Sequence, residues 1–495
     1  MIAIASKISS RHRLSDLLAG LGDERCRHDV EVGGLALDSR QVRVGDLFVA
    51  VPGTGADGRD FVQDSLRRGA VAVLCETGGG YDFTGLAVPV FVTTDVRSQL
   101  GIIVNRFFGS PSQEMTVIGV TGTNGKTTCT HLLAQTLDSS AERCALIGTL
   151  GSGFPDALEG MDNTTPDVVA IHRLLGQFLH AGASRVCLEV SSHALDQQRT
   201  AGVAFDIAVF TNLSRDHLDY HADMHRYAQA KAALFEVEGL QRAVVNRDDA
   251  FGRELLGCLA GRVETISFGI EGGDVHARAI RLLTDGLEVE AMTPQGAVRI
   301  RCPLLGRFNA ANLLAALASL LACGVSLDAA QAGLSAIKPV AGRVERYGGK
   351  AGVPLVVVDY AHTPDALEQV LRAVREHAHG RVCCVFGCGG DRDRGKRPQM
   401  GRLAEQLSDR VVLTDDNPRH EPGDRIIADI AAGMQARPRV IRDRAEAIST
   451  AIAEADARDV VLIAGKGHED YQQVGDRRVP YSDRATVRRL LGDAA

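Results

Sequence analysis

The chain has 495 residues, 45% hydrophobic and 24% charged, a composition typical of a globular protein too long for one hydrophobic core. Its 55 basic and 62 acidic residues leave a net charge of −7, which argues against a nucleic-acid-binding protein. No stretch approaches the roughly 20 apolar residues that span a membrane, and the N-terminus lacks a long apolar signal segment. The eleven cysteines form no CxxC pair, so neither a zinc site nor a redox motif is indicated. We therefore expect a cytoplasmic protein without membrane insertion.

Three segments differ in pattern, and together they predict an α/β fold with three domains. In residues 1–112, short apolar runs such as LFVAV alternate with turns rich in Gly and Asp, and the turn-forming FFGSPSQ closes the segment. In residues 113–340, buried strands alternate with helices, which favours a mostly parallel sheet. In residues 341–495, four apolar strands end in polar residues, as in VVVDYAH and VVLTDDNP. Ligands bind at that edge of open α/β sheets.

A phosphate-binding loop is the strongest local signal. An apolar strand at 117–120 leads into a Gly-rich loop at 122–128, and a helical pattern follows. Glycines let backbone N–H groups surround phosphate oxygens, Lys126 neutralises charge, and Thr127 can place its hydroxyl on Mg²⁺. The strict pattern GxxxxGK[ST] is not met, because Val120 occupies the place of its first Gly. The alternative is a Gly-rich strand–helix turn with a chance lysine.

Two further side chains are candidates for holding a metal near the phosphates. Glu189 ends the strand VCLEV, and His217 follows the next strand. In a parallel sheet both would reach the edge that carries the phosphate loop, where Mg²⁺ needs carboxylate ligands. Taken alone, each is more often a structural turn residue.

Six strings occur in order along the chain: TGTNGKTT, EVSSHAL, TNLSRDHLDYH, GRFNAANLLAA, GRVE and DYAHTPDAL. Together they resemble the Mur ligases of bacterial peptidoglycan assembly, and most closely those that extend UDP-N-acetylmuramoyl-L-alanyl-D-glutamate by the third stem-peptide residue. The resemblance implies a uridine-nucleotide-binding domain at 1–112, an ATP-binding P-loop domain at 113–340 and a Rossmann-like amino-acid-binding domain at 341–495. It also implies ATP and Mg²⁺ as cofactors and an acyl phosphate intermediate. We expect a monomer.

The resemblance assigns roles to residues at matching positions. Those implied to hold the ATP phosphates are Gly122, Thr123, Asn124, Gly125, Lys126, Thr127 and Thr128. Those on the adenine and ribose side are Asn309, Asn312, Arg343 and Asp359. The implied uridine-nucleotide pocket comprises Leu37, Ser39, Thr54, Gly55 and Ala56. The implied contacts to the muramoyl-peptide are Asn163, Thr164, Thr165, Ser191, Gln197 and Arg199. Without the family, several of these strings are ordinary turn or helix-cap compositions.

Lys231 lies in a helical pattern, where a lysine is usually solvent-facing. The resemblance matches it to a lysine that CO₂ carboxylates, which turns a cation into an anionic ligand for Mg²⁺. The implied metal ligands are then Thr127, Glu189, His217 and Lys231, and the implied catalytic residues are Lys126, His217 and Lys231. Carboxylation requires an unprotonated amine, which a desolvated site near other cations favours.

The string Asp416, Asn417, Pro418 and Arg419 bears on which amino acid is added. Read from its residues alone, it is a tight turn after the strand VVLT. In the resemblance, DNPR marks the enzymes that add meso-diaminopimelate. An Arg fork can bind the distal carboxylate of that amino acid and would repel the ammonium of lysine. Arg392, Gly465 and Glu469 match further positions around the amino acid, with Arg392 chosen by spacing from several arginines in its loop.

Other functions stay open at this point. A lysine-adding ligase would lack Arg419, and a folylpolyglutamate synthase would lack the N-terminal LDSR and the DNPR string. A nucleotide-driven switch or motor normally carries an Asp on its Walker-B strand, whereas the strand here ends in Glu189. An inactive scaffold would have no need of Lys126, Glu189, Lys231 and Arg419 together.

Overall fold

The computed structural model describes residues 11–21, 29–53, 56–283, 286–349 and 352–492, which form two compact units. The first unit comprises residues 1–119, 137–208 and 233–241, and the second comprises 120–136, 209–232 and 242–495. The fold is mixed α/β with parallel sheets, which confirms the predicted class. The expected boundaries near 112 and 340 stay predictions. In the described part of the chain, no helix combines the length and apolar character needed to cross a bilayer.

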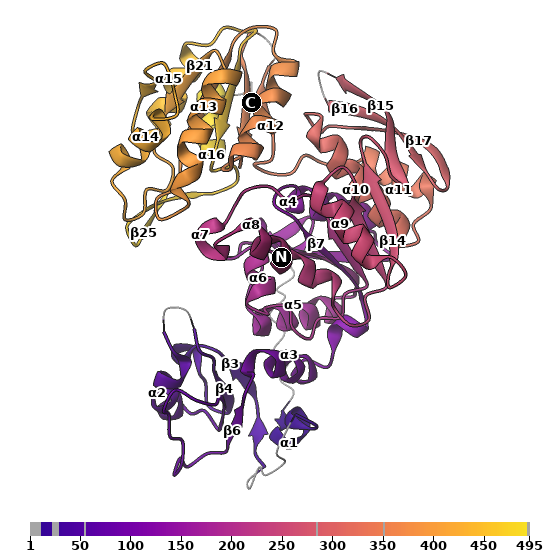
Figure 1. Cartoon of the computed structure of the whole chain (residues 1–495), viewed down its shortest axis with the longest axis vertical. Coiled ribbons are helices and arrows are strands. Elements are labelled where there is room, and N and C mark those ends of the chain that lie inside the picture. The colour runs from indigo at the N-terminus through magenta and orange to yellow at the C-terminus, as the bar shows by residue number, and fades with distance from the viewer. Residues whose placement is uncertain (1–10, 22–28, 54–55, 284–285, 350–351, 493–495) are drawn as a thin grey trace. The chain divides into compact units, whose positions relative to one another are not determined.

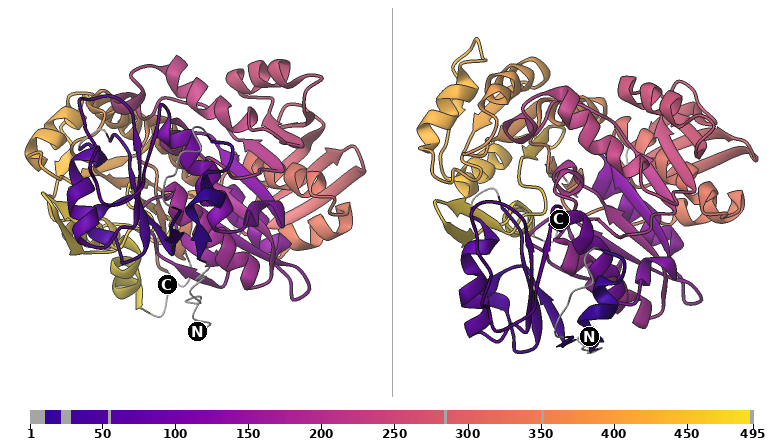
Figure 2. Two further views of the ribbon diagram at one scale, coloured as in Figure 1. Left: turned by 90° about the horizontal axis from the view of Figure 1, so that it is seen from below. Right: turned by 60° about the horizontal axis from the view of Figure 1, so that its bottom comes forward.

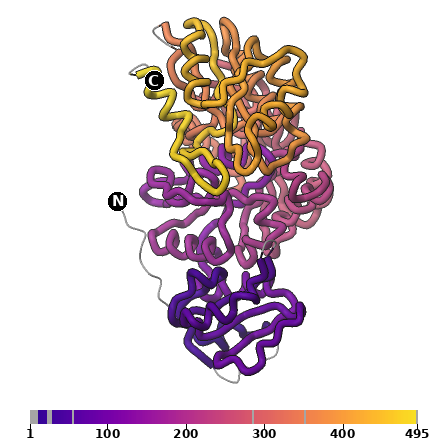
Figure 3. The backbone as a smooth tube through the Cα atoms, turned by 90° about the vertical axis from the view of Figure 1, so that its left-hand side faces the viewer, coloured from indigo at the N-terminus to yellow at the C-terminus, as the bar shows by residue number. Residues whose placement is uncertain are grey.

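The first unit contains a parallel sheet covered on both faces. Its four described strands run in the order β3 (Gly34–Ala36), β4 (Asp46–Ala50), β5 (Ala72–Glu76) and β6 (Val90–Thr93), drawn in indigo and violet in Figure 3. In β4, Leu47 and Val49 pack with α1 (Leu14–Leu18) and α3 (Val96–Phe107), whereas Phe48 and Ala50 pack with α2 (Val62–Arg67). Burial of both faces explains why LFVAV is a continuous apolar run. Two short strands, β1 (His12–Arg13) and β2 (Glu31–Val32), precede this sheet in the chain and form an antiparallel pair of their own.

The central sheet runs, over its described strands, in the order β10-β9-β8-β11-β7-β12-β13-β14-β15-β16-β17. Its pairs β8–β11, β13–β14 and β14–β15 are parallel, and the pairs β10–β9 and β9–β8 at one end and β15–β16 and β16–β17 at the other are antiparallel. In the first unit the elements are β8 (Arg143–Gly148), β9 (Gly151–Phe154), β10 (Ala157–Glu159), α5 (Val168–His180), β11 (Ala183–Glu189) and α6 (Ser192–Asp196). Both units share β7 (Thr116–Thr121) and β12 (Ile207–Phe210).

The second unit carries the rest of that sheet, with α10 and α11 beside its strands in Figures 1 and 2. Its elements are α4 (Lys126–Leu137), α7 (Leu218–His221), α8 (Met224–Ala232), β13 (Arg242–Asn246), α9 (Ala250–Leu259), β14 (Glu264–Gly269), β15 (Val275–Leu283), β16 (Gly286–Thr293), β17 (Gly296–Cys302), α10 (Phe308–Ala322) and α11 (Leu327–Ser335). The predicted helices after the phosphate loop and around Lys231 are therefore present.

A second sheet forms the C-terminal part of the second unit (Figure 1). Its described strands run β18 (Glu345–Gly348), β19 (Leu355–Asp359), β23 (Val460–Ala464), β20 (Val382–Phe386), β21 (Arg410–Leu413) and β22 (Arg439–Val440), parallel except for β18. Phe386 and Leu462 pack under α12 (Pro364–His377), α13 (Arg397–Leu407) and α14 (Gly423–Ala431). Val385 and Ile463 pack under α15 (Arg444–Ala453) and α16 (Asp483–Leu491). The hairpin β24 (Tyr471–Val474) and β25 (Arg477–Pro480) follows β23. Strands β19, β20, β21 and β23 end in the polar strings singled out in the sequence, all at one edge.

Candidate active site

The phosphate loop joins the end of β7 to α4, which begins at Lys126. The loop after β12 holds its backbone, because Asn212 accepts the Thr123 N–H on its carbonyl at 2.8 Å and the Asn124 N–H on Oδ1 at 2.9 Å. Lys126 Nζ donates to the loop carbonyls of Gly122, at 2.9 Å, and Thr123, at 3.0 Å. The loop therefore has a fixed backbone and carries both a lysine and the N-terminus of a helix. This arrangement binds phosphate groups in proteins.

Two glycines make this loop possible. Gly122 and Gly125 have φ angles of +145° and +86°. A Cβ atom at Gly122 would meet the Thr211 hydroxyl, and one at Gly125 would meet the side-chain oxygen of Asn312. The loop thus needs glycine both for its backbone conformation and for its close approach to neighbouring segments.

A buried carboxylate lies between two histidines in the second unit. Asp216 Oδ2 is 3.1 Å from His217 Nε2 and 3.9 Å from His362 Nε2. Burial disfavours the charged form of Asp216, but the neighbouring His217, His362 and Lys396 outweigh it and hold its pKa at about 2. The carboxylate is therefore ionised, and His217, expected at a metal, contacts Asp216 here.

Lys231 is buried, contrary to the usual position of a helical lysine. Its Nζ donates to the Gly122 carbonyl at 2.7 Å and lies 4.5 Å from the centre of the Tyr227 ring. Burial, and then the charge of Lys126, lower its pKa well below the ordinary value, while Asp216 acts in the opposite direction. The desolvated site that carboxylation requires is therefore present.

Arg343 connects the phosphate loop to the C-terminal sheet within the second unit. Its Nη2 donates to the Thr127 hydroxyl at 2.9 Å, and its guanidinium lies 4.6 Å from the centre of the Tyr360 ring. Asp359, at the end of β19, accepts the Val344 N–H at 2.8 Å and is buried. Burial raises the pKa of Asp359, and the charge of Arg343 works against that rise. Arg343 and Asp359, both expected at the nucleotide, thus lie on adjoining segments.

The other two residues expected near adenine lie on α10. Asn309 donates to the Leu305 carbonyl at 2.8 Å, and Asn312 donates to Asn309 Oδ1 at 2.8 Å. Both are buried, as is Thr128 in the first turn of α4. Asn312 also packs against Gly125, so α10 supports the phosphate loop from behind.

A cavity of about 200 Å³ opens at the carboxyl edge of the C-terminal sheet, within the second unit. Its lining includes the predicted residues His217, Arg392, Asp416, Asn417, Arg419, Gly465 and Glu469. Most of the residues expected around the incoming amino acid, from three separate strings, therefore share one cavity.

The arginines near this cavity differ in their partners. Arg394 and Arg397 both pair with Glu421, each at 2.8 Å, whereas Arg392 lines the cavity. Burial, and then the nearby charge of Arg392, lower the pKa of Arg419 from its ordinary value. An anion in the cavity would relieve both effects.

The DNPR loop is fixed by neighbours in the C-terminal hairpin and in the loop just before it. Asn417 Nδ2 donates to Glu469 Oε2 at 2.9 Å, and its Oδ1 accepts the Gln473 N–H at 2.9 Å. Arg419 has a φ angle of +50°, and its N–H donates to the Gln473 carbonyl at 3.0 Å. Pro418 is buried between them. The loop thus holds Arg419 in a set conformation.

In the first unit, Glu189 organises the residues expected at the muramoyl-peptide. Its carboxylate accepts the backbone N–H of Thr149 at 2.9 Å and the Thr149 hydroxyl at 3.0 Å, and that hydroxyl lies 3.0 Å from the hydroxyl of Thr164. Thr165 donates its hydroxyl to the Glu189 carbonyl at 2.7 Å and accepts the Ser191 N–H at 3.1 Å. These four predicted residues therefore form one network.

Arg199 extends that network. It donates to Gln197 Oε1 at 2.7 and 3.0 Å and to the Thr165 carbonyl at 2.9 Å. Asn163 is exposed and makes no hydrogen bond with these residues in the described part of the chain. The predicted set is thus brought together except for Asn163.

The residues expected at the uridine nucleotide lie in and around the N-terminal sheet. Leu37 packs on its core, Ser39 is buried, and the Ala56 carbonyl accepts the Gly53 N–H at 3.1 Å. The remaining two, Thr54 and Gly55, lie outside the described residues.

The structure adds residues that the sequence did not indicate. Arg97, on α3, donates to the Pro52 carbonyl at 2.7 Å and to the Gln197 carbonyl at 3.4 Å, which joins the predicted uridine pocket to the peptide positions. Asp216 and Lys396 both line the cavity in the second unit. Asp216 could have been considered from its place beside His217, whereas Arg97 and Lys396 stand in strings without a distinctive spacing.

The predicted metal ligands are divided between the units. Glu189 belongs to the first unit, and Thr127, His217 and Lys231 belong to the second. Among the residues that the structure describes, no three His, Cys, Asp or Glu side chains gather as a metal-binding group. The metal-binding set stays a prediction.

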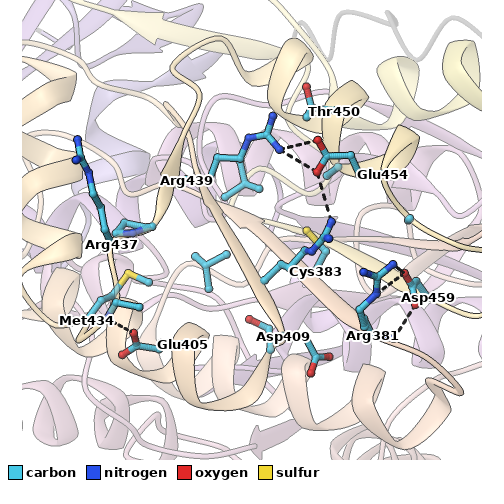
Figure 4. A pocket seen from close by; sticks show the side chains of 18 residues that line it. Arg381, Cys383, Glu405, Asp409, Met434, Arg437, Arg439, Thr450, Glu454 and Asp459 are labelled. Carbon is cyan, nitrogen blue, oxygen red and sulfur yellow. Dashed lines mark hydrogen bonds and ion pairs between the residues drawn. The ribbon is translucent and has the colours of Figure 1, made fainter.

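A larger cavity, of about 430 Å³, lies at the opposite, amino edge of the C-terminal sheet (Figure 4). Five of its charged groups pair with one another: Arg439 and Arg410 with Glu454, at 2.7 and 3.4 Å, and Arg381 with Asp459, at 2.9 Å. Because these charges are already matched, and because ligands bind at the carboxyl ends of such strands, the smaller cavity is the candidate site.

Comparison with known proteins agrees with this arrangement. Three family models match: the Mur ligase family catalytic domain at residues 31–107, the Mur ligase middle domain at 120–320, and the Mur ligase glutamate ligase domain at 342–467. A UDP-N-acetylmuramoyl-L-alanyl-D-glutamate--2,6-diaminopimelate ligase of Alkalilimnicola ehrlichii is 50% identical over 493 residues, covering 97% of this chain and 99% of that protein. One of the same name from Pseudomonas aeruginosa is 49% identical over 470 residues, covering 94% and 96%. A solved structure of a ligase of that name is 37% identical with a TM-score of 0.67, covering 93% and 95%. The chain therefore belongs to the Mur ligase family.

Proposed function

We propose that this chain joins meso-2,6-diaminopimelate to the D-glutamate carboxylate of UDP-N-acetylmuramoyl-L-alanyl-D-glutamate in peptidoglycan synthesis. Family membership makes it an ATP-dependent ligase of an acid and an amino acid. The observation that carries the choice of amino acid is the cavity in which Arg419 lies with Asn417 and Glu469, in a chain half identical to named diaminopimelate ligases. We place the reaction in the cytoplasm and expect a monomer to perform it.

The reaction has two steps. A glutamate carboxylate oxygen forms a bond to the γ-phosphorus of ATP while the bond to ADP breaks, which gives an acyl phosphate. The amine of diaminopimelate then attacks the acyl carbon, so that a C–N bond forms, inorganic phosphate leaves and the nitrogen loses a proton. The ordered loop with Lys126 stabilises the transferring phosphoryl charge, and Arg343 fixes the Thr127 hydroxyl beside it.

Bound Mg²⁺ would neutralise phosphate charge during the transfer. The residues of the second unit fit a hard cation on one condition. As an amine, Lys231 donates to the Gly122 carbonyl at 2.7 Å and offers no anionic oxygen. Its burial lowers its pKa, which keeps it reactive toward CO₂, and the resulting carbamate would add anionic oxygens to the predicted ligands Thr127 and His217.

The choice of diaminopimelate over lysine rests on charge. The two amino acids differ by a carboxylate on the distal carbon. Arg419 is a half-buried guanidinium whose charge is disfavoured first by burial and then by Arg392. A distal carboxylate would pair with Arg419 through two N–H donors, whereas the ammonium of lysine would meet a like charge. Glu469, tied to Asn417, would accept from the distal ammonium.

Phosphate release tests the proposal directly. The protein is supplied with ATP, Mg²⁺ and UDP-N-acetylmuramoyl-L-alanyl-D-glutamate, and meso-diaminopimelate and L-lysine are added in separate reactions. We expect release with diaminopimelate and little with lysine. Release that is faster with lysine would assign the chain to the lysine-adding ligases, and release that needs no amino acid would point to a nucleotide-driven switch.

A further inference from the structure

Lys466 is a fully buried cation behind the amino-acid cavity. It lies in the loop after β23, and its side chain has 0% exposure. Its Nζ donates to Glu469 Oε2 at 2.7 Å and to Asn417 Oδ1 at 3.0 Å, and lies 3.5 Å from Asp416 Oδ1. All three partners belong to the set expected around the incoming amino acid, but Lys466 itself does not line the cavity.

These contacts fix how Asn417 and Glu469 face the cavity. Asn417 Oδ1 accepts from both Lys466 and the Gln473 N–H, so its Nδ2 is directed to Glu469 Oε2, at 2.9 Å. That oxygen of Glu469 therefore receives two donors, whereas Oε1 has no hydrogen bond within the described residues. Since Glu469 lines the cavity, Oε1 is the atom left for a ligand.

Lys466 also sets the charge at this end of the cavity. Among the residues matched to the amino acid, Asp416 and Glu469 contribute two carboxylates and Arg392 and Arg419 contribute two cations. Lys466 adds a buried cation beside the two carboxylates, which water cannot screen. The distal end of diaminopimelate, with one ammonium and one carboxylate, is neutral overall, whereas the distal end of lysine is a cation. A fixed positive charge here weakens the binding of lysine more than the binding of diaminopimelate.

We propose that Lys466 is a positioning and specificity-determining residue, which orients Asn417 and Glu469 toward the distal ammonium and disfavours an amino acid whose distal end is a net cation. The inference rests on the proposed function. Lys466 acts through Asn417, Asp416 and Glu469. Its removal leaves the two carboxylates less neutralised, and their negative charge then attracts the distal ammonium of lysine.

Lys466→Met tests both parts in the phosphate-release assay. We expect the KM for diaminopimelate to rise about tenfold or more, the KM for ATP to stay constant, and the preference for diaminopimelate over lysine in kcat/KM to narrow by about tenfold. Lys466→Gln keeps a donor but no charge, and should regain part of the KM while the preference stays narrowed. Arg381→Met is the matched control, because it removes a cation at the opposite edge of the same sheet.

An equal loss of activity with both amino acids, at an unchanged preference, would overturn the specificity role, and an unchanged KM for diaminopimelate would overturn the positioning role. Thermal unfolding checks that each variant folds. If both single variants fail to fold, Lys466→Met with Glu469→Gln removes one cation and one carboxylate and leaves the net charge of the wild type. This double variant must raise the KM for diaminopimelate while the preference stays near that of the wild type, or the inference falls. A wild-type chain inactive with diaminopimelate refutes the proposed function instead, and this inference with it.

Discussion

Replacing Arg419 by Ala should raise the KM for diaminopimelate without disturbing the loop that carries it. The backbone N–H of Arg419 donates to Gln473, and its carbonyl accepts from Gly475 at 2.8 Å; both bonds survive the substitution. The φ angle of +50° is as strained for Ala as for Arg, so the substitution changes the strain energy of the backbone very little. What is lost is the Arg419 guanidinium, whose Nη1 donates to Gly390 at 2.9 Å.

The size of the effect follows from the charges. A charge-assisted pair is worth about 1.5–3 kcal/mol, and each 1.4 kcal/mol is about a factor of ten, so the KM should rise about 10- to 150-fold. Asp416 and Glu469 remain and would repel the distal carboxylate, which favours the upper part of that range. Steady-state phosphate release with varied diaminopimelate measures it. Arg394→Ala removes a neighbouring arginine that pairs with Glu421 and should leave the KM unchanged. An unchanged KM in Arg419→Ala would show that Arg419 does not bind the substrate.

Three further substitutions test other parts of the site. Arg343→Ala removes the 2.9 Å bond to Thr127 and should raise the KM for ATP about five- to tenfold, measured by ADP release; a change confined to the amino acid would contradict it. Lys231→Met should abolish a ¹³C carbamate signal that the wild type shows under labelled CO₂, and a wild type without the signal refutes carboxylation. Burial, and then Arg343, lower the pKa of His131 to about 4, so between pH 6.5 and 4 the unfolded chain binds a proton that the folded chain does not. The free energy of unfolding should therefore fall by up to about 3 kcal/mol as the pH drops through that window. In urea titrations, His131→Leu should reduce the fall in the free energy of unfolding over this pH range. Substitution of the exposed His180 by Leu should leave that fall unchanged.

Much of this arrangement could be predicted from local sequence. Continuous apolar runs predicted the buried strands, and the polar strings after them predicted the edge where the cavity opens, because both signals depend on neighbours in sequence. The choice of Arg392 by spacing stays a prediction; in the structure Arg392 lines the cavity, whereas Arg394 and Arg397 pair with Glu421.

The residues that sequence reasoning missed depend on contacts between distant segments. Lys466 meets Asn417 across 49 positions, and Arg97 reaches Gln197 across 100. No periodicity or motif marks such pairs, since each lysine or arginine looks like an ordinary surface residue until the fold removes it from water. The burial of Lys231 was anticipated only through the family, because its helical string alone favours exposure.

The carbonyl of Gly122 accepts from two lysines, Lys126 at 2.9 Å and Lys231 at 2.7 Å. Conversion of Lys231 to a carbamate would withdraw one of these donors and replace it with an anion, and the carbonyl would then depend on Lys126 alone. Lys126 must also turn toward the phosphates when a nucleotide arrives. Carboxylation and nucleotide binding would thus each withdraw one donor from this carbonyl, and the hydrogen bonds from Thr123 and Asn124 to Asn212 would be left to hold the backbone of the loop.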